Sequence, residues 1–195
     1  MVVEMTRAPA FEPIGSEARS FLLRLARATI AARLEGRALP AAAPENPVLL
    51  EPRGAFVTLT SGGRLRGCIG HVVGVSPLWM SVRDNALVAA FDDPRFPPLA
   101  GHELPGVHIE ISALSPLVEC APEEITVGGD GVLVERGAAR GLLLPQVAVE
   151  HGWDRETFLD HTCRKAGLAA SSWRDPAIVL FRFSAEVFGE EAVSP

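Results

Sequence analysis

The residues best suited to chemistry lie in one short run, residues 64–70, with the sequence RLRGCIG. Cys68 stands there between glycines and two residues after Arg66, and a nearby cation raises the thiolate fraction through which a cysteine reacts. If the run is a strand, alternation puts Arg66 and Cys68 on one face and Gly67 on the other. Gly67 and Gly70 remove side chains beside the sulfur, so a ligand or another backbone could come close. This run is therefore the first candidate site.

Several interpretations of this run stay open. Cys68 is a nucleophile or redox thiol with Arg66 as its thiolate stabiliser, or a thiol that only lines a binding cleft, or a small buried hydrophobe, as free cysteines usually are. The structural alternative for Arg66 is a surface ion pair, which contributes little energy. Ile69 and His71 complete the candidate ligand-binding residues of the run, and His71 is the histidine expected nearest to Cys68.

The second candidate is Glu110, in a segment where Val107, Ile109 and Ile111 alternate with polar residues. This period of two predicts a half-buried strand with Glu110 on its polar face. A carboxylate there could pair with Arg66 or act as a general base. The alternative is an ordinary solvated strand face.

Two further residues are candidates for ligand binding. Arg95 lies in a segment restricted by Pro94 and Pro97, and such a preset loop can hold an arginine for carboxylate or phosphate recognition. Equally, Arg95 could bond loop carbonyls in a structural role. Gln146 follows Pro145 and could present its amide to a ligand or cap the start of a helix.

The cysteines exclude some classes of site. Cys68, Cys120 and Cys163 are far apart and show no C-x-x-C spacing, which disfavours a disulfide framework or a zinc cluster. Reduced thiols in the cytoplasm fit this pattern. His161 and Cys163, two apart on a predicted helix, point in different directions. We therefore assign no metal and no cofactor.

The composition narrows the function classes. In 195 residues, a hydrophobic content of 48% and a charged fraction of 22% suit one globular domain with a sizeable core. The net charge of −6 and the scattered arginines argue against nucleic acid as a main partner. No apolar stretch is long enough for a membrane span, and the first 15 residues do not resemble a secretory signal.

The elements expected around these residues are helices segregated from hairpins, which favours an α+β fold with a mainly antiparallel sheet. We expect a loose arm over 1–15, a domain over 16–188 and a tail over 189–195. Helices are expected over 16–35, from Ser76 to 91, after Pro145 and from Asp154 to 167, and strands over 54–60, 64–70, 107–112, 131–135, 141–144 and 177–187.

Six segments together resemble the AMMECR domain family, whose members include the protein A component of the AmmeMemoRadiSam system. They are LRGCIG at 65–70, GAFVTL at 54–59, DPRFPPL at 93–99, GLLLPQV at 141–147, HGW at 151–153 and WRDP at 173–176. The resemblance covers residues 16–188 and implies an α+β fold with a larger sheet-bearing lobe, a smaller lobe and a cleft near the LRGCIG run. It also implies partnership with a Memo-like protein and a radical-SAM protein.

Two functions from different classes follow. One is a cleft-bearing accessory or binding protein that takes a small molecule or docks its partners, in which Cys68 contributes only shape. The other is a cysteine-dependent enzyme, with Cys68 as nucleophile or redox thiol, Arg66 as thiolate stabiliser and Glu110 as proton carrier. We favour the first, because a cysteine nucleophile needs a positioned base and the sequence assigns no histidine to that role.

Overall fold

The computed structural model describes residues 12–190, and the chain within this range divides into two compact units. The first unit comprises residues 12–114 and 186–190, and the second comprises residues 115–185. Each has its own buried hydrophobic cluster. The two units are described separately below.

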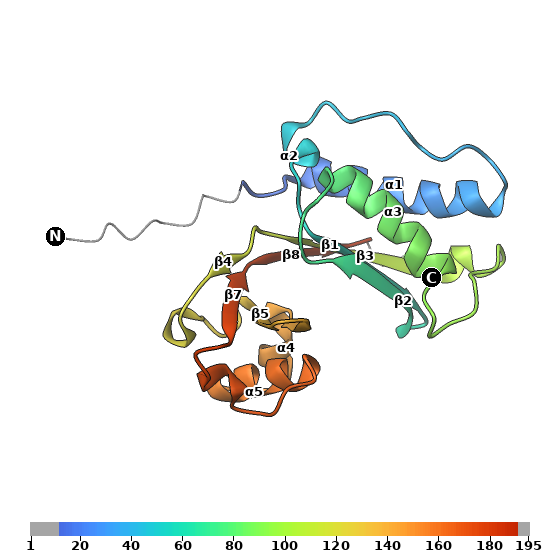
Figure 1. The fold of residues 1–195 in the computed structure, drawn as a ribbon. Helices are drawn as coiled ribbons and strands as arrows, with labels where there is room; N and C mark the ends of the chain where they lie inside the picture. The colour runs from blue at the N-terminus through green and yellow to red at the C-terminus, as the bar shows by residue number, and fades with distance from the viewer. Residues whose placement is uncertain (1–11, 191–195) are drawn as a thin grey trace. The chain divides into compact units, whose positions relative to one another are not determined.

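The first unit is a four-stranded sheet with helices packed on one face (Figure 1). Its helices are α1 (Ser16–Leu34), α2 (Pro47–Leu50) and α3 (Leu78–Phe91), followed by a short 3-10 turn at Leu104–Gly106. Its strands, in sheet order, are β2 (Arg64–His71), β1 (Ala55–Ser61), β3 (Val107–Leu114) and β8 (Ala185–Gly189).

Alternation along the central strands separates the two faces of this sheet. Val57 and Leu59 on β1, with Ile109 and Ile111 on β3, are fully buried in the cluster that α1 and α3 cover. The residues between them point to the other face and are half-buried. Cys68 and Glu110 share this second face, with Thr58 between them.

The second unit is also a four-stranded antiparallel sheet with helices packed against it. Its strands, in sheet order, are β4 (Val118–Glu119), β7 (Val179–Phe183), β5 (Gly131–Arg136) and β6 (Ala139–Leu143). Its helices are α4 (Pro145–Glu150) and α5 (Arg155–Lys165), with 3-10 turns at Pro122–Glu124 and Ser172–Arg174. Phe158 and Leu159 of α5 are fully buried in its core.

The predicted α+β class with antiparallel sheets and flanking helices is confirmed. The predicted start at Asp154 is confirmed, because its side chain accepts a hydrogen bond from the N–H of Thr157 at the start of α5. The helix expected from Ser76 instead begins at Leu78, and neither α1 nor α3 has a side-chain cap. The short helix α2 and strand β4 were missed, because elements this short carry too little periodicity to detect.

One predicted strand was wrong in a way that matters for the fold. The segment 177–187 was expected to form a single strand, but it forms β7 and β8, which belong to different sheets. The break falls at Ser184, whose N–H donates to the Ser115 side chain while its carbonyl accepts from the Ser115 N–H. Apolar residues on both sides of Ser184 made the segment resemble one strand.

The predicted arm and tail are only partly described. Residues 1–11 and 191–195 lie outside the described range, but Ile14 is buried and its N–H donates to the Glu186 carboxylate. At the other end, the Glu190 N–H donates to the carbonyl of Ile109, and the Glu190 side chain pairs with Arg27. Residues 12–15 and Glu190 are therefore part of the first unit. No helix within residues 12–190 is long and apolar enough to cross a membrane.

Candidate functional site at Cys68

Cys68 lies on β2, an edge strand, and its main chain is bound on the open side by the loop after α3. Its N–H donates to the Asp93 carboxylate at 2.9 Å, and its carbonyl accepts from Arg95 Nη2, also at 2.9 Å. An unpaired strand edge exposes such groups to water or to another chain. Here side chains take the place of a neighbouring strand.

Asp93 organises this loop. Its carboxylate is 3% exposed and also accepts hydrogen bonds from the N–H, Nε and Nη2 of Arg95. The hydrogen bonds from the Arg95 guanidinium hold the pKa of Asp93 well below its usual range, although burial acts in the opposite direction. The same hydrogen bond raises the pKa of Arg95. The pair is charged at neutral pH and is named the Asp93–Arg95 clamp below.

The sulfur of Cys68 contacts the neighbouring strand. Cys68 is opposite Thr58 in the β1–β2 register, and the Thr58 hydroxyl donates to Sγ at 3.3 Å. Cys68 directs its N–H and carbonyl away from β1, so the two residues form a non-hydrogen-bonded pair, the kind that brings facing side chains closest. The cysteine is half-buried and free of any disulfide.

Glu110 lies in one cross-strand row with Cys68 and Thr58, named the row below. Thr58 is opposite Cys68 on one side and opposite Glu110 on the other, so the order across the sheet is Cys68, Thr58, Glu110. With strands about 4.8 Å apart, the outer two are separated by about 10 Å between Cα atoms. Within residues 12–190, the half-buried Glu110 side chain has no hydrogen bond or ion-pair partner. The structure thus places Cys68 and Glu110 on one sheet face, with a hydroxyl between them.

Arg66 is bound elsewhere. Its Nε and Nη2 donate to the two Glu103 carboxylate oxygens at 2.9 and 3.1 Å. A register shift between Leu59 and Thr60 leaves Arg66 without an opposite residue on β1, so strict alternation does not carry from Cys68 to Arg66. The Arg66 hydrogen bonds lower the pKa of Glu103 to about 2. Arg95, rather than Arg66, is the arginine that contacts Cys68.

The space beside the glycines is filled by protein. A Cβ on Gly67 would lie 2.1 Å from the Ala89 carbonyl oxygen of α3, and one on Gly70 would lie 2.4 Å from the Phe56 ring. Of the two neighbours expected beside these glycines, a ligand or another backbone, the second is confirmed at Gly67, where the α3 main chain comes close. Instead, Gly67 permits close packing of α3 on the sheet.

The remaining candidates are scattered. Ile69 packs against the core under the helices, and His71 is exposed at the end of β2, with no side-chain partner among residues 12–190. Gln146 is half-buried near the start of α4, in the second unit. The cluster around Cys68 is built from the first unit alone, and none of these three side chains contributes a hydrogen bond to it.

The prediction missed three members of the site, Thr58, Asp93 and Glu103. The Asp93-Pro94-Arg95 order carried a usable signal, because an aspartate two residues before an arginine in a tight turn can bond it locally. Thr58 could have been found by alternation along β1, had the register with β2 been known. Nothing in the sequence links Glu103 to Arg66 across 37 residues.

Burial disfavours the thiolate form of the other two cysteines. Burial raises the pKa of the Cys120 thiol to about 11 and also raises that of Cys163. Within residues 12–190, no three His, Cys, Asp or Glu side chains gather in a way that could hold a metal ion.

Known proteins share the fold that in this chain carries the LRGCIG strand and the adjoining Asp-Pro-Arg turn. The AMMECR1 family model matches residues 23–188. The chain belongs to the AMMECR1 family. A protein of Methanothermobacter thermautotrophicus is 44% identical over 191 residues, which cover 93% of this chain and 98% of that protein. One from Pyrococcus furiosus is 45% identical over 190 residues, which cover 91% of this chain and 90% of that protein.

A crystal structure supports the fold of this AMMECR1 protein. The structure of an uncharacterised protein from Pyrococcus horikoshii matches with a TM-score of 0.83 and 41% identity, over 91% of this chain and 94% of that one. The resemblance seen in the sequence is confirmed as family membership. The names of these relatives state no activity, so function has to be argued from the site.

Proposed function

We propose that this AMMECR1 protein is an accessory or binding protein that uses the sheet face carrying Cys68, Thr58 and Glu110 as its binding surface. Its site is a cleft that takes a small molecule or docks a Memo-like protein and a radical-SAM protein, in the cytoplasm. One observation carries the proposal: the Asp93–Arg95 clamp fixes the Cys68 main chain, and among residues 12–190 the sulfur's side-chain partners are the Thr58 hydroxyl and the Arg95 guanidinium, which are donors rather than bases.

The position of the clamp supports a recognition role. It bonds the outward edge of β2, whereas the side chains of the row project from the sheet face. The row offers an unpartnered carboxylate, a hydroxyl and a soft sulfur on a strand held in place. Such a small set of polar groups on a rigid element suits recognition of a ligand or a partner surface.

The test measures binding of the Memo-like and radical-SAM proteins encoded by the same organism, by calorimetry with the purified proteins. Thr58→Arg places a bulky cation in the middle of the row and should weaken binding at least about tenfold, a loss of about 1.4 kcal/mol. Cys68→Ala should keep binding within about threefold, because the sulfur supplies only shape. The control is Arg33→Glu, an exposed position on α1. Unchanged binding after Thr58→Arg would exclude this face as the docking surface.

A second candidate is cysteine-dependent chemistry, favoured by the order of the row. A hydroxyl at 3.3 Å can stabilise a developing thiolate, and the unpartnered Glu110 carboxylate can accept the thiol proton through Thr58 or a water. Arg95, held at the Cys68 carbonyl, adds positive charge nearby.

The alkylation rate of Cys68 separates the two candidates. Iodoacetamide labelling with peptide mapping uses Cys120 and Cys163 as slow internal references, since burial raises the pKa of both. Under the enzymatic alternative, Cys68 labels fast at neutral pH, and both Thr58→Val and Glu110→Gln slow it about fivefold or more. Under the binding proposal, labelling is slow and neither substitution changes it by more than about twofold.

A further inference from the structure

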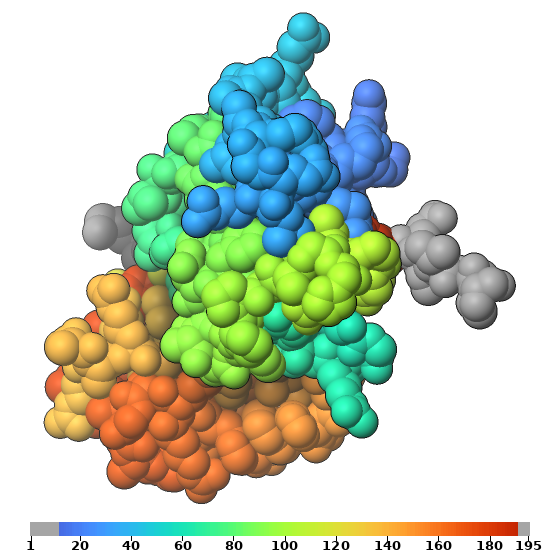
Figure 2. All heavy atoms as spheres, turned by 90° about the vertical axis from the view of Figure 1, so that its right-hand side faces the viewer, coloured from blue at the N-terminus to red at the C-terminus, as the bar shows by residue number. Residues whose placement is uncertain are grey.

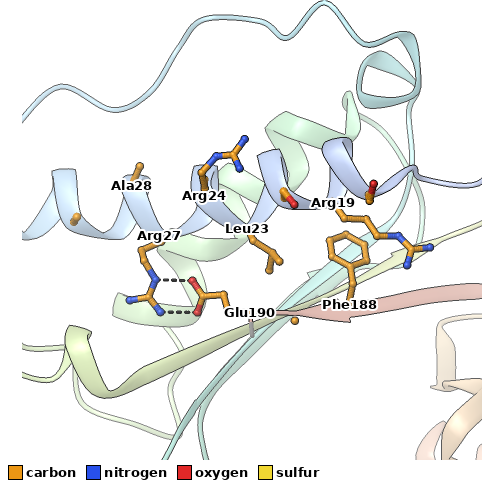
Figure 3. A pocket seen from close by; sticks show the side chains of 11 residues that line it. Arg19, Leu23, Arg24, Arg27, Ala28, Phe188 and Glu190 are labelled. Atoms are coloured by element: carbon orange, nitrogen blue, oxygen red, sulfur yellow. Dashed lines mark hydrogen bonds and ion pairs between the residues drawn. The ribbon is translucent and has the colours of Figure 1, made fainter. Parts of the chain in front are cut away.

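A groove lies along α1 at the opposite edge of the first unit's sheet from Cys68. It measures about 600 Å³ and is lined by one stripe of α1 together with the end of β8 (Figure 3). Leu23 of α1 and Phe188 of β8 point toward each other across its floor (Figure 3). Ala28 and Ala31 extend the lining with small apolar side chains.

Within residues 12–190, no strand pairs with the side of β8 that borders this groove. β8 ends the sheet order, with β3 as its neighbour on one side only. The Glu190 N–H donates to the Ile109 carbonyl of β3, and the Ser115 N–H donates to the Ser184 carbonyl. In an antiparallel ladder the main-chain groups of successive residues point alternately to the two sides of the strand. The N–H and carbonyl groups of the even-numbered residues of β8 therefore point to β3, and those of Val187 and Gly189 point outward. Both outward residues are exposed.

The charges around the groove are unequal. Arg19 pairs with Glu186 at one end, and Arg27 pairs with Glu190 at the other end through two 2.5 Å contacts. Arg24, between them on α1, is exposed and has no hydrogen bond or ion-pair partner among residues 12–190. Arg24 lines the groove, and in Figure 3 its side chain extends from the side of α1 turned away from Phe188. One cation is therefore free for an incoming anion.

We infer that the free edge of β8 and the groove beside α1 bind an extended, acidic segment of a partner protein by strand addition. The outward N–H and carbonyl groups of Val187 and Gly189 pair with the main chain of the segment. Alternate apolar side chains of the segment lie over Leu23 and Phe188, and a carboxylate reaches Arg24. This inference does not depend on the function proposed for the Cys68 face.

The charge distribution distinguishes this partner from a second copy of the chain. Pairing of β8 with β8 around a two-fold axis would bring the same arginine-bearing stripe of α1 from both copies together. Like charges in proximity oppose such an association. An acidic segment instead gains from Arg24, and the short, uncharged outward positions of β8 offer no protection against strand addition.

The test uses a fluorescein-labelled peptide of alternating glutamate and valine, with an alternating lysine and valine peptide as its control. Anisotropy should show binding of the acidic peptide to the full chain and at least about tenfold weaker binding of the basic one. Val187→Pro removes an outward donor without breaking the β3 ladder and should weaken binding about tenfold, whereas Val187→Thr should leave it unchanged. Arg24→Glu should weaken binding about fivefold, and Arg33→Glu, outside the groove, should not.

Hydrogen exchange of the Val187 and Gly189 amides provides the second measurement. The inference predicts fast exchange in the free chain and protection when the acidic peptide is added. Protection without peptide at every protein concentration would mean that the chain itself covers the edge, and protection that rises with concentration would mean a second copy. Either result overturns the inference, as does acidic-peptide binding that is indifferent to Val187→Pro and Arg24→Glu.

Discussion

At the scale of single residues, the site depends on one buried carboxylate. Asp93 accepts four hydrogen bonds, three from Arg95 and one from the Cys68 N–H. A buried carboxylate is costly unless its oxygens are satisfied, and here the donors come from both its own turn and the adjoining strand. Asp93 therefore connects the loop after α3 to the strand that carries the cysteine.

Removing this carboxylate should loosen the edge strand. Asp93→Ala leaves the Cys68 N–H and the Arg95 guanidinium without their acceptor, at a cost of about 2 kcal/mol in the free energy of unfolding. Alkylation of Cys68 should become faster at the same time, because the strand edge opens more often. Urea denaturation and labelling rates check this, with Asp92→Ala as the exposed neighbouring control. Equal effects of the two substitutions would contradict the clamp.

The Arg66–Glu103 pair should give a stability that depends on acid pH. The pKa of Glu103 falls from an ordinary 4.5 to about 2 on folding, mainly through the Arg66 hydrogen bonds. A lowered folded-state pKa means that the contribution is fully present above pH 4.5 and is lost as the pH falls toward 2.

The midpoint of urea unfolding, measured as a function of pH, tests this pH dependence. At neutral pH, Glu103→Gln should be less stable than the native protein by about 1 kcal/mol. The two curves should converge as the pH is lowered through the range between the unfolded and folded pKa values of Glu103. Glu150→Gln, at an exposed position on α4, is the matched control and should show no such convergence. A difference that persists unchanged at low pH would rule out the ion pair as its source.

At the scale of elements, α3 is packed closely on the edge of the sheet. The Ala89 carbonyl occupies the place that a Cβ at Gly67 would need. This approach places the end of α3, and hence the turn with Asp93 and Arg95, beside β2. The segment around residue 100 continues between the end of α1 and the β1–β2 hairpin (Figure 2), consistent with the contacts of Glu103 to Arg66 and Arg27 to Leu104.

Adding one methyl group at this contact should separate the two elements. Gly67→Ala would place a Cβ 2.1 Å from a backbone oxygen, so α3 or β2 has to shift, at a cost of about 2 kcal/mol or more. Gly101→Ala is the control, because nothing lies within 4 Å of its Cβ. Thermal unfolding of the two variants gives the comparison, and similar stabilities would show that the contact is easily relaxed.

At the scale of the whole molecule, the described chain holds two separate hydrophobic cores. The core of the first unit gathers around α1, α3 and their sheet, and the core of the second unit gathers around α5 and its sheet. The chain passes between the units after Leu114 and again after Ala185. Each unit therefore has its own source of stability.

Separate cores predict separate responses to a core substitution. Phe158→Ala empties a fully buried position in the second unit and should destabilise it by about 4 kcal/mol. Native-state hydrogen exchange should then show the greatest loss of protection in β5, β6 and α5, and a smaller loss in β1 and β3. Leu22→Ala in α1 is the reciprocal variant and should give the opposite pattern. Equal losses in both units for either variant would indicate a single cooperative unit.

The sequence by itself determined the elements and the family. Periodicity located the long helices and most strands, and capping chemistry located the start of α5, since these signals depend on residues close together in the chain. The same local pattern predicted Cys68 on a strand and Glu110 on the polar face of another. Shared segments in the same order identified the AMMECR1 family.

Only the tertiary structure decided which of these residues meet. Strand order and register placed Thr58 between Cys68 and Glu110. A one-residue irregularity in β2 interrupts the alternation between Cys68 and Arg66, and Arg66 binds Glu103 instead of Cys68. Asp93 accepts from the Cys68 N–H across 25 residues, and at Ser184 the chain passes from β7 in the second sheet to β8 in the first. These contacts join segments distant in the chain, where loop closure and packing, rather than local preference, set the geometry.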